Sequence, residues 1–406
     1  MSILSQQFQQ LSQLLEQART DWQQTPFSCT ELPWPELASA LLAMSEDELD
    51  RLDMDDTAAL AWLGQWRPQL LALDALQLPE LSRAVDYATP RWSSGIGGRK
   101  WAQIKDFAAN IQRFSRSFPE ATPEIKAQPK LAILEWCAGK GHLGRLLAQQ
   151  GALKVTSLEW APDLCAQGQA LAAQLQLPHE FVCADALSKE AAALFQPEQC
   201  AVALHACGEL HLRFLKHAAK AGSQHIALSP CCYHLIADQH YQPLSGLGQQ
   251  LDLKLDRHSL RLPLQQQVTG GERIRRLRHI ELTWRLAFDE LQRHLTGDHS
   301  YLPLPSFPKQ LLSGDFNDFV GWACAKKSLT VPQHIDSQHW LALADKRRLL
   351  VKRIELVRHR YRYLLELWLL LDKALFLEEH HYQMQLGLFT DLLHTPRRYL
   401  LQARLR

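Results

Sequence analysis

The chain has 406 residues, which is enough for two domains or for one domain with large additions. Hydrophobic residues make up 46% of it and charged residues 21%, the composition of an ordinary soluble globular protein. The longest apolar cluster, Tyr363 to Leu377, contains Glu366, Asp372 and Lys373. Three ionisable side chains in so short a stretch exclude a membrane span.

The N-terminus and the cysteines indicate a cytoplasmic protein. Met1 to Gln10 contains neither basic residues nor a long apolar run, so we expect no signal peptide. The nine cysteines are odd in number and have no repeated spacing, which fits reduced thiols better than a disulfide framework. We therefore predict a cytoplasmic location and no membrane partner. The sequence leaves the oligomeric state open.

Charge is distributed unevenly along the chain. Residues 1–90 hold 4 Lys and Arg against 14 Asp and Glu, a net charge of −10. The remaining residues hold 40 against 29, a net charge of +11. The acidic segment would not bind nucleic acid, whereas the rest of the chain has the charge to do so.

Residues 1–90 are expected to form an acidic, helical N-terminal domain. Pro35 suits the first turn of a helix that runs to Met44, and Ser45 and Glu48 match a capping box for the next helix. A further helix is expected over residues 57–76, with an interruption near Pro68. Nothing in this segment indicates catalysis.

Residues 87–104 are rich in glycine, and they precede a helix that we expect to begin at Arg99 and Lys100 and to run to Phe114. One interpretation is a linker into the next domain. The other is a lid whose cations, or Trp101, face a ligand.

From residue 131 the pattern alternates between strands and helices, as in a doubly wound parallel sheet within an α/β core at residues 91–265. Five strands are predicted at residues 131–136, 154–159, 180–184, 200–206 and 225–229, with helices near 143–150, 161–176, 187–196 and 209–221. Residues 251–264 are a candidate for a later strand. Functional residues in such sheets collect at the carboxyl ends of the strands.

The first predicted strand leads into a glycine-rich loop and the start of a helix. The candidate cofactor-binding residues of this loop are consecutive: Ala138, Gly139, Lys140, Gly141 and His142. Glycine lets a ligand approach the backbone of the turn, and the N-terminus of the helix offers free N–H groups to an anion. The loop predicts a nucleotide-type ligand without saying which one.

Acidic residues near three strand ends narrow the choice of ligand. Glu159 is placed to bind a ribose diol, and Asp185 is placed to accept from an adenine amino group. Glu135, just before the loop, favours a ligand that has an amino group of its own. Together these residues predict an adenosine-type ligand, and a dinucleotide and S-adenosylmethionine both remain open at this point.

The fourth and fifth strands end in residues that are candidates for catalysis. His205 and His234 are candidate general bases, Cys231 and Cys232 are candidate nucleophiles, and Tyr233 is a candidate for stacking on a flipped base. The alternative interpretations are that the cysteines are buried core residues and that His205 braces a loop. A zinc site formed by Cys207, Cys231, Cys232 and His234 is conceivable, but adjacent cysteines chelate poorly, and we predict no metal.

Three blocks of the sequence resemble signature blocks of one methyltransferase group: Trp-Cys-Ala-Gly-Lys-Gly-His-Leu-Gly-Arg at 136–145, Ala-Leu-His-Ala-Cys-Gly-Glu-Leu at 203–210 and Ser-Pro-Cys-Cys-Tyr-His at 229–234. The group is the methyltransferase-like family that includes the "ribosomal RNA adenine dimethylase domain-containing" protein. The eukaryotic tRNA 2′-O-methyltransferase is a more distant member. The resemblance implies that the first block binds S-adenosylmethionine and that the other two line the substrate side, with His205 a candidate for contact with the cofactor as well.

Outside these blocks the resemblance is weaker. Arg99 and Lys100 lie where the family has a Lys-rich block, and Ala102 and Gln103 replace its usual His-Glu pair. Residues 365–379 and 395–398 are similar to the family's C-terminal helix and to the entry into its final strand. The implied architecture is an α/β fold, with a Rossmann-like class I methyltransferase sheet, a helical N-terminal domain and a helical C-terminal extension.

Residues 266–395 are expected to be this helical, basic extension, including a long helix at about 341–379, and residues 396–406 are expected to return to the core as a final strand. Its basic residues suit a phosphate backbone, although arginines that only solvate a helix are the alternative. The candidate RNA contacts are Arg273, Arg276, Lys346, Arg347, Arg348, Lys352 and Arg353.

The sequence therefore predicts a methyltransferase that uses S-adenosylmethionine, with RNA as the favoured acceptor. A protein or small-molecule acceptor is the enzymatic alternative. Two further alternatives are a scaffold that binds the cofactor without turnover and, less favoured, an NAD-dependent oxidoreductase.

Overall fold

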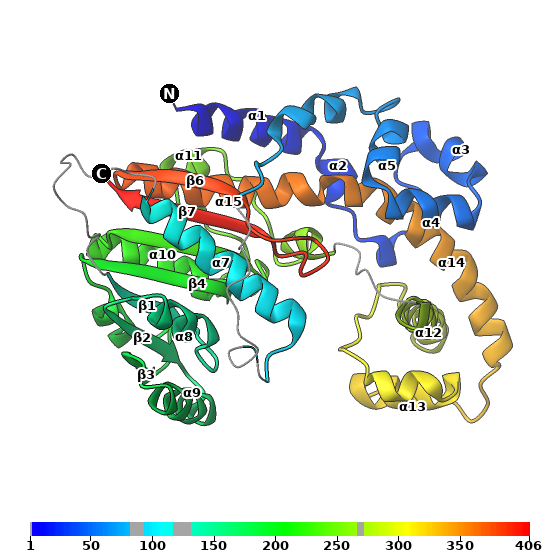
Figure 1. The fold of residues 1–406 in the computed structure, drawn as a ribbon. Helices are drawn as coiled ribbons and strands as arrows, with labels where there is room; N and C mark the ends of the chain where they lie inside the picture. The colour runs from blue at the N-terminus through cyan, green and yellow to red at the C-terminus, as the bar shows by residue number, and fades with distance from the viewer. Residues whose placement is uncertain (1, 82–92, 94, 117–130, 266–271) are drawn as a thin grey trace. The chain divides into compact units, whose positions relative to one another are not determined.

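The computed structural model describes residues 2–81, 93, 95–116, 131–265 and 272–406 (Figure 1). The chain forms two compact units. The first contains Met1–Glu16, Leu73–Gln265 and Tyr363–Arg406, and the second contains Gln17–Ala72 and Gln266–Arg362. Each unit thus combines segments that are distant in sequence. This grouping differs from the consecutive domains predicted with boundaries at residues 90, 265 and 395.

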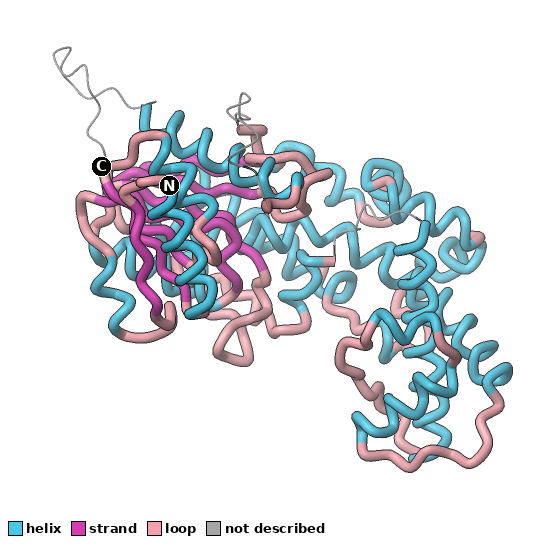
Figure 2. The backbone as a smooth tube through the Cα atoms, turned by 60° about the horizontal axis from the view of Figure 1, so that its bottom comes forward, coloured by secondary structure: helices cyan, strands magenta, loops and turns pink. Residues whose placement is uncertain are grey.

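The first unit is built on a seven-stranded sheet with the strand order β3-β2-β1-β4-β5-β7-β6. The strands are β1 (Ala132–Trp136), β2 (Lys154–Glu159), β3 (His179–Cys183), β4 (Gln199–Cys207), β5 (His225–Cys231), β6 (Tyr382–Leu388) and β7 (Tyr399–Leu405). Strands β1 to β5 pair in parallel, whereas β7 is antiparallel to both β5 and β6. The strands gather into the single magenta sheet of Figure 2. This topology confirms the predicted Rossmann-like class I methyltransferase fold.

The first five strands and the last one lie where they were predicted, within one or two residues at most ends. The predicted strand at residues 251–264 is wrong, because that segment contains the 3₁₀ helix η4 (Ser259–Leu264). Pro263 has no N–H to donate to a ladder, which disfavours a strand there. The additional strand of the sheet is instead β6, which lies within residues 266–395, where a helical extension was predicted.

The α-helices in chain order are α1 (Ile3–Gln17), α2 (Arg19–Trp22), α3 (Pro35–Ala43), α4 (Glu46–Met54), α5 (Asp56–Leu63), α7 (Gly98–Arg116), α8 (His142–Gln149), α9 (Pro162–Gln174), α10 (Glu209–Ala221), α11 (Gly246–Gln250), α12 (Glu272–Thr296), α13 (Phe316–Lys327), α14 (Ser337–Arg358) and α15 (Arg362–Glu379). The other 3₁₀ helices are η1 (Pro26–Ser28), η2 (Pro68–Leu76), η3 (Glu190–Leu194), η5 (Lys309–Ser313) and η6 (His359–Tyr361). The helix predicted at 187–196 is therefore only the short η3, and the one predicted at 341–379 is interrupted by η6.

The two faces of the sheet are covered by different helices because side chains alternate along each strand. Ile133 belongs to a cluster with Ile104 of α7 and Leu146 of α8. Trp136, three residues further along β1, contacts Phe214 of α10 on the opposite face, with ring centroids 6.1 Å apart. With both faces covered, the carboxyl ends of β1 to β5 are left at one edge of the sheet, where the loops that follow them collect.

Helix α7 begins close to Arg99, as predicted. Trp101 packs into the core with Ile104 and Phe107, so it does not face a ligand. Of the predicted lid or linker at residues 87–104, residues 87–92 and 94 lie outside the described residues.

The second unit is helical. Helices α12, α13 and α14 share a core that includes Phe288, Phe319 and Val351. None of the helices in the described part of the chain is long and apolar enough to cross a membrane.

Candidate functional site

The glycine-rich loop between β1 and α8 has an open side and a packed side. Gly139 and Gly141 both have a φ of 61°, the left-handed conformation that favours glycine. A Cβ atom on Gly141 would lie 2.4 Å from the Phe181 ring, so packing against β3 requires glycine there. A Cβ atom on Gly139 would meet nothing within 4 Å. The space beside Gly139 is therefore available to a ligand.

The carboxylate of Glu159, at the end of β2, joins the glycine loop to the following turn. It accepts hydrogen bonds from the backbone N–H of Gly139 at 2.8 Å and of Ala161 at 3.0 Å. Asp185, after β3, is exposed, and its carboxylate accepts from the N–H of Leu187 at 2.8 Å. Both acids thus lie at the same edge of the sheet as the loop.

Cys137, the first residue of the loop, shows that these strand ends converge. Burial raises the pKa of its thiol to about 12, and the charges of Glu159, Cys207 and Asp185 add to the effect. An electrostatic effect of this kind requires proximity. The ends of β1, β2, β3 and β4 therefore lie near one another at one edge of the sheet.

Trp160 is a residue of this edge that the sequence analysis missed. It follows Glu159 directly and is 76% exposed, an unusual degree for a large aromatic side chain. An exposed indole beside the carboxylate predicted to bind a ribose offers a flat surface on which a purine can stack. Its position immediately after the β2 acid was the signal available in the sequence.

Glu135 lies beneath the loop, enclosed by protein. It is 4% exposed, and its carboxylate accepts from the Ser157 hydroxyl at 2.5 Å. The same hydroxyl is 2.7 Å from Nε2 of His179. Burial raises the pKa of Glu135 to about 7, against the lowering effects of Ser157 and of the Gly144 N–H. The structure therefore places Glu135 where it supports the loop, rather than on its open side, where it was predicted to meet the amino group of a ligand.

The remaining loop residues surround the start of α8. Ala138 and Lys140 are partly exposed, as is His142. The ring of His142 is hydrogen-bonded to the guanidinium of Arg145. Burial, helped by the positive charges of Arg145, Lys100 and Lys140, lowers the pKa of His142 to about 4, so this imidazole is neutral at physiological pH.

His205 is held at the end of β4 in a strained conformation. Its φ is 66°, and the register between β4 and β5 shifts between Leu204 and Ala206. Non-glycine residues in this conformation are uncommon and gather at functional sites. Cys137 and Cys232 have similar values of 57° and 48° at the ends of β1 and β5, so three strand ends at this edge share the conformation.

Gln103 of α7 determines which nitrogen of His205 carries the proton. Its amide nitrogen donates to the carbonyl of His394 at 3.0 Å, so its oxygen faces Nε2 of His205 at 2.7 Å. Nε2 must therefore donate, which leaves Nδ1 with a free lone pair. Burial lowers the pKa of His205 to about 4, with a further contribution from the positive charge of Arg397. Gln103 stands where the methyltransferase-like family that the sequence resembles has the glutamate of its His-Glu pair. Its hydrogen bond with His205 could not be predicted from the sequence.

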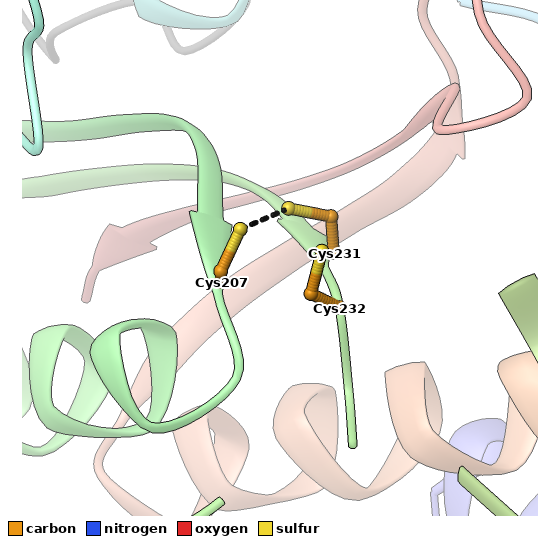
Figure 3. Close-up of side chains that lie close together, drawn as sticks. All are labelled: Cys207, Cys231 and Cys232. Atoms are coloured by element: carbon orange, nitrogen blue, oxygen red, sulfur yellow. Dashed lines mark hydrogen bonds between the residues drawn. The ribbon is translucent and has the colours of Figure 1, made fainter. Parts of the chain in front are cut away.

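Three thiols meet beside His205 (Figure 3). The sulfur atoms of Cys207, Cys231 and Cys232 all lie within 4.8 Å of one another, and those of Cys207 and Cys231 are 3.2 Å apart. Hydrogen bonds from Cys207 and Cys231 hold the pKa of Cys232 well below its usual value, whereas the pKa of the buried Cys231 is raised. Of the two candidate nucleophiles, Cys232 is partly exposed and Cys231 is 4% exposed, so Cys232 is the one that a substrate can reach.

The other two residues of the Cys-Cys-Tyr-His block differ in exposure. Tyr233 is 1% exposed and donates to Glu366 at 2.9 Å. A buried phenol has no open face for a base, so the prediction that Tyr233 stacks on a substrate does not agree with the structure. His234 is partly exposed, and its buried Nδ1 has no hydrogen-bond partner among the described residues.

Three cations lie within electrostatic range of the edge where His205 and the thiols lie. The charge of Arg397 acts on His205, Cys207 and Cys232, and that of Lys100 acts on His205. The charge of Arg261 acts in turn on His234. These side chains come from the start of α7, from η4 and from the segment before β7, which only the tertiary structure brings together.

Most of the basic residues predicted to contact RNA have partners within the second unit. Arg347 binds Asp289 and Glu290, and Arg348 and Lys352 bind Glu46. Arg353 donates to the carbonyls of Leu41, Leu42 and Met44. The acidic helix α4 therefore neutralises part of the basic helix α14. Arg273, Arg276 and Lys346 are exposed.

Residues 99–239 match the family model described as "Methyltransferase domain". The chain therefore contains a methyltransferase domain. Its matched residues extend from the start of α7 through the glycine loop, both acids and the three thiols to the loop after β5. The cofactor of this domain is S-adenosylmethionine. Comparison with curated proteins gives no match.

Among solved structures, the methyltransferase domain is similar to two with related ligands bound. The tRNA (uracil-54, C5)-methyltransferase of Pyrococcus abyssi, in complex with S-adenosyl-L-homocysteine, is 14% identical, with a TM-score of 0.24; the match covers 32% of this chain and 28% of that one. The magnesium protoporphyrin IX methyltransferase of Synechocystis, with S-adenosylmethionine bound, is 17% identical, with a TM-score of 0.26, over 36% of this chain and 64% of that one. This chain thus spans less than two thirds of either relative. At these scores neither structure indicates the acceptor of this chain.

The residues of the methyltransferase domain fit this cofactor. The open space beside Gly139, the carboxylate of Glu159 and the exposed face of Trp160 lie on consecutive turns at one edge of the sheet. They provide a close backbone approach, acceptors for a ribose diol and an apolar plane for adenine.

Proposed function

We propose that the chain is an enzyme that transfers a methyl group from S-adenosylmethionine to an anionic acceptor, with RNA as the favoured class. The glycine loop, with Glu159 and Asp185 beside it, supports the assignment of the donor. The observation that carries the acceptor class is the group of cations on the His205 side of the edge: Lys100, Arg261 and Arg397. Positive side chains around a partly buried site favour phosphate or carboxylate groups.

The proposed contacts with the donor follow from the placement of the side chains. Glu159 accepts from the ribose hydroxyls, Trp160 stacks on adenine and Asp185 accepts from the adenine amino group. The N–H groups at the start of α8, beside Lys140 and His142, face the carboxylate of the methionine part. Glu135 supports the loop from below.

Bound S-adenosylmethionine supplies an electrophilic methyl group that an acceptor takes by in-line displacement. The protein contributes alignment of the acceptor and exclusion of water. An acceptor that must lose a proton needs a base in its neutral form, and the Nδ1 lone pair of His205 meets this requirement. Its low pKa makes it a weak base, so its part is to receive a proton as the new bond forms rather than to ionise the acceptor beforehand.

A thiolate mechanism is the alternative for a pyrimidine acceptor, and Cys232 is the residue that would carry it. The Cys232→Ser variant distinguishes the thiolate mechanism from proton transfer to His205. Retained methyl transfer by Cys232→Ser excludes a covalent adduct, and loss of transfer together with retained cofactor binding supports one.

Two further observations support RNA over other anions. The resemblance of the three sequence blocks extends to the eukaryotic tRNA 2′-O-methyltransferase. Arg273, Arg276 and Lys346 are exposed cations of the second unit that suit phosphate contacts.

The test is transfer of a labelled methyl group to separate pools of total RNA, protein and metabolites. We expect label in RNA, and a decrease of at least tenfold in Arg397→Ala and Lys100→Ala. Lys216→Ala changes an exposed lysine of α10 and should transfer like the wild type. Label in protein or metabolites alone would replace RNA as the acceptor.

Calorimetric titration separates the enzyme from its alternatives. We expect heat with S-adenosylhomocysteine and none with NAD. Binding of NAD alone would refute the methyltransferase assignment. Binding of S-adenosylhomocysteine without label in any pool would favour a scaffold that does not turn over.

A further inference from the structure

We propose that Cys207, Cys231 and Cys232 form a binding site for a thiophilic metal ion, Zn²⁺, with three thiolate ligands. The three sulfur atoms lie within 4.8 Å of one another, and those of Cys207 and Cys231 are 3.2 Å apart (Figure 3). A zinc ion about 2.3 Å from each sulfur in tetrahedral geometry requires sulfur atoms about 3.7 Å apart. This value lies between the 3.2 Å separation of Cys207 and Cys231 and the 4.8 Å limit that all three pairs satisfy, so small side-chain adjustments suffice for binding.

The backbone explains how two adjacent cysteines can serve one ion. Successive side chains of a regular strand point to opposite faces, so Cys231 and Cys232 would ordinarily diverge. Strand β5 ends at Cys231, and Cys232 has a φ of 48°, which breaks the alternation. The sulfur of Cys232 consequently returns towards that of Cys231. Strained conformations persist only where the surrounding structure imposes them.

Strand pairing supplies the third ligand. Cys207 is the register partner of Cys231 across β4 and β5, after the irregularity at Leu204 and Ala206. The N–H of Gly208 also donates to the carbonyl of Cys231 at 3.0 Å, so the two strand ends are tied together. Gly208 has to be glycine, because a Cβ atom would lie 2.1 Å from the carbonyl oxygen of Leu235. The ligand set is therefore held by backbone on both strands.

The environment suits the charge and the access that such an ion needs. Cys207 and Cys232 are partly exposed, so an ion can reach the cluster, while Cys231 is 4% exposed. Arg397 lies within electrostatic range of Cys207 and Cys232 and offsets the net negative charge of three thiolates on one divalent ion. His234 is outside the group of mutually close ligand atoms, which leaves the fourth coordination position to solvent.

Thiol ligands select soft ions, and tetrahedral sulfur sites are typical of zinc. Binding displaces the thiol protons to solvent, so affinity should rise with pH. All nine cysteines are free thiols in the structure, so the ligands are present in the form that binding requires.

The test measures metal in the full chain, purified under reducing conditions, stripped with a chelator and reloaded with Zn²⁺. We expect about one zinc per chain by elemental analysis. Loading with Co²⁺ should give the absorption of tetrahedral cobalt together with a thiolate-to-cobalt charge-transfer band. Cys207→Ser, Cys231→Ser and Cys232→Ser should each lower the zinc content at least fivefold. Cys183→Ser and Cys29→Ser change cysteines outside the cluster and should keep it.

Binding of S-adenosylhomocysteine by each variant shows that its domain is folded. The wild-type cobalt spectrum does not depend on any variant, and its absence would overturn the proposal. Undiminished zinc content in the three cluster variants would overturn the proposal as well. So would a Cys207–Cys231 disulfide that persists in the chain purified under reducing conditions. The zinc and cobalt measurements on the wild-type chain involve neither methyl transfer nor the cofactor, so their result is independent of the proposed function.

Discussion

Gly139 and Gly141 form a matched pair that separates cofactor binding from packing. Both have a φ of 61°, so alanine at either position should destabilise the fold by about 1–2 kcal/mol through the left-handed backbone alone. A Cβ atom on Gly139 meets nothing within 4 Å, whereas one on Gly141 lies 2.4 Å from Phe181 and 2.8 Å from His179. Overpacking of this kind adds about 1–3 kcal/mol. We therefore expect Gly141→Ala to lose about 2–5 kcal/mol and Gly139→Ala only about 1–2 kcal/mol.

For cofactor affinity the order of the two variants is the reverse, because the Cβ atom added by Gly139→Ala enters the space assigned to the cofactor. We expect Gly139→Ala to bind S-adenosylhomocysteine at least tenfold more weakly while remaining folded. Urea denaturation measures the first quantity and calorimetric titration the second. Gly321→Ala is the control: this glycine lies inside α13 with open space around it, so neither stability nor affinity should fall. Equal losses of stability in the two loop variants would refute the packing argument, and normal affinity in Gly139→Ala would refute the location of the cofactor.

Three further predictions concern titration and buried polar contacts. Because the pKa of His205 is lowered from 6.5 to about 4, its neutral form stabilises the fold above pH 6.5, and this contribution is lost as the pH falls through about 4. Methyl transfer that depends on His205 should accordingly have a rate that is constant from about pH 5 to 8. The Gln103→Glu substitution should raise the pKa of His205 by about 1–3, as measured by NMR titration. An unchanged pKa would contradict the hydrogen bond between Gln103 and His205. Tyr233→Phe removes the hydroxyl that donates to buried Glu366, so it should lower the free energy of unfolding by about 1–3 kcal/mol and leave the methyl-transfer rate unchanged. A large decrease in that rate would instead indicate that Tyr233 contacts the substrate. Asp372 accepts hydrogen bonds from Tyr241, Leu244 and Ser245, so Asp372→Ala should lower the free energy of unfolding by about 3–5 kcal/mol. Asp163→Ala, at an exposed position, should lower it by less than about 0.5 kcal/mol. Equal losses for the two variants in urea denaturation would contradict this prediction.

The parallel part of the sheet was predictable because its signals are local. Apolar runs of five or six residues, separated by helical stretches, place β1 to β5, and the glycines after β1 mark the loop. Strand β6 was missed because it lies beyond a long helical region and joins the sheet through its pairing with β7. Its alternating Tyr382, Met384 and Leu386 were the available signal.

The charged residues show where local patterns fail. Arg348 and Lys352 look like a basic surface in the sequence, but Glu46, more than 300 residues away, accepts from both. Residues 17–72 of the acidic segment and helix α14 thus belong to one folded unit rather than to two separate domains. Charge counted along a chain cannot show which charges are already paired.

The sequence by itself determined the fold class, the glycine loop and the acids that follow β2 and β3, because each depends on residues adjacent in the chain. Tertiary structure alone decided the environment of the reacting edge. Gln103 reaches His205 from α7, Arg397 reaches it from the segment before β7, and the left-handed backbone at Cys232 turns two adjacent cysteines into a cluster with Cys207. Such convergence depends on strand order and on single backbone angles, which hydrophobic periodicity does not encode.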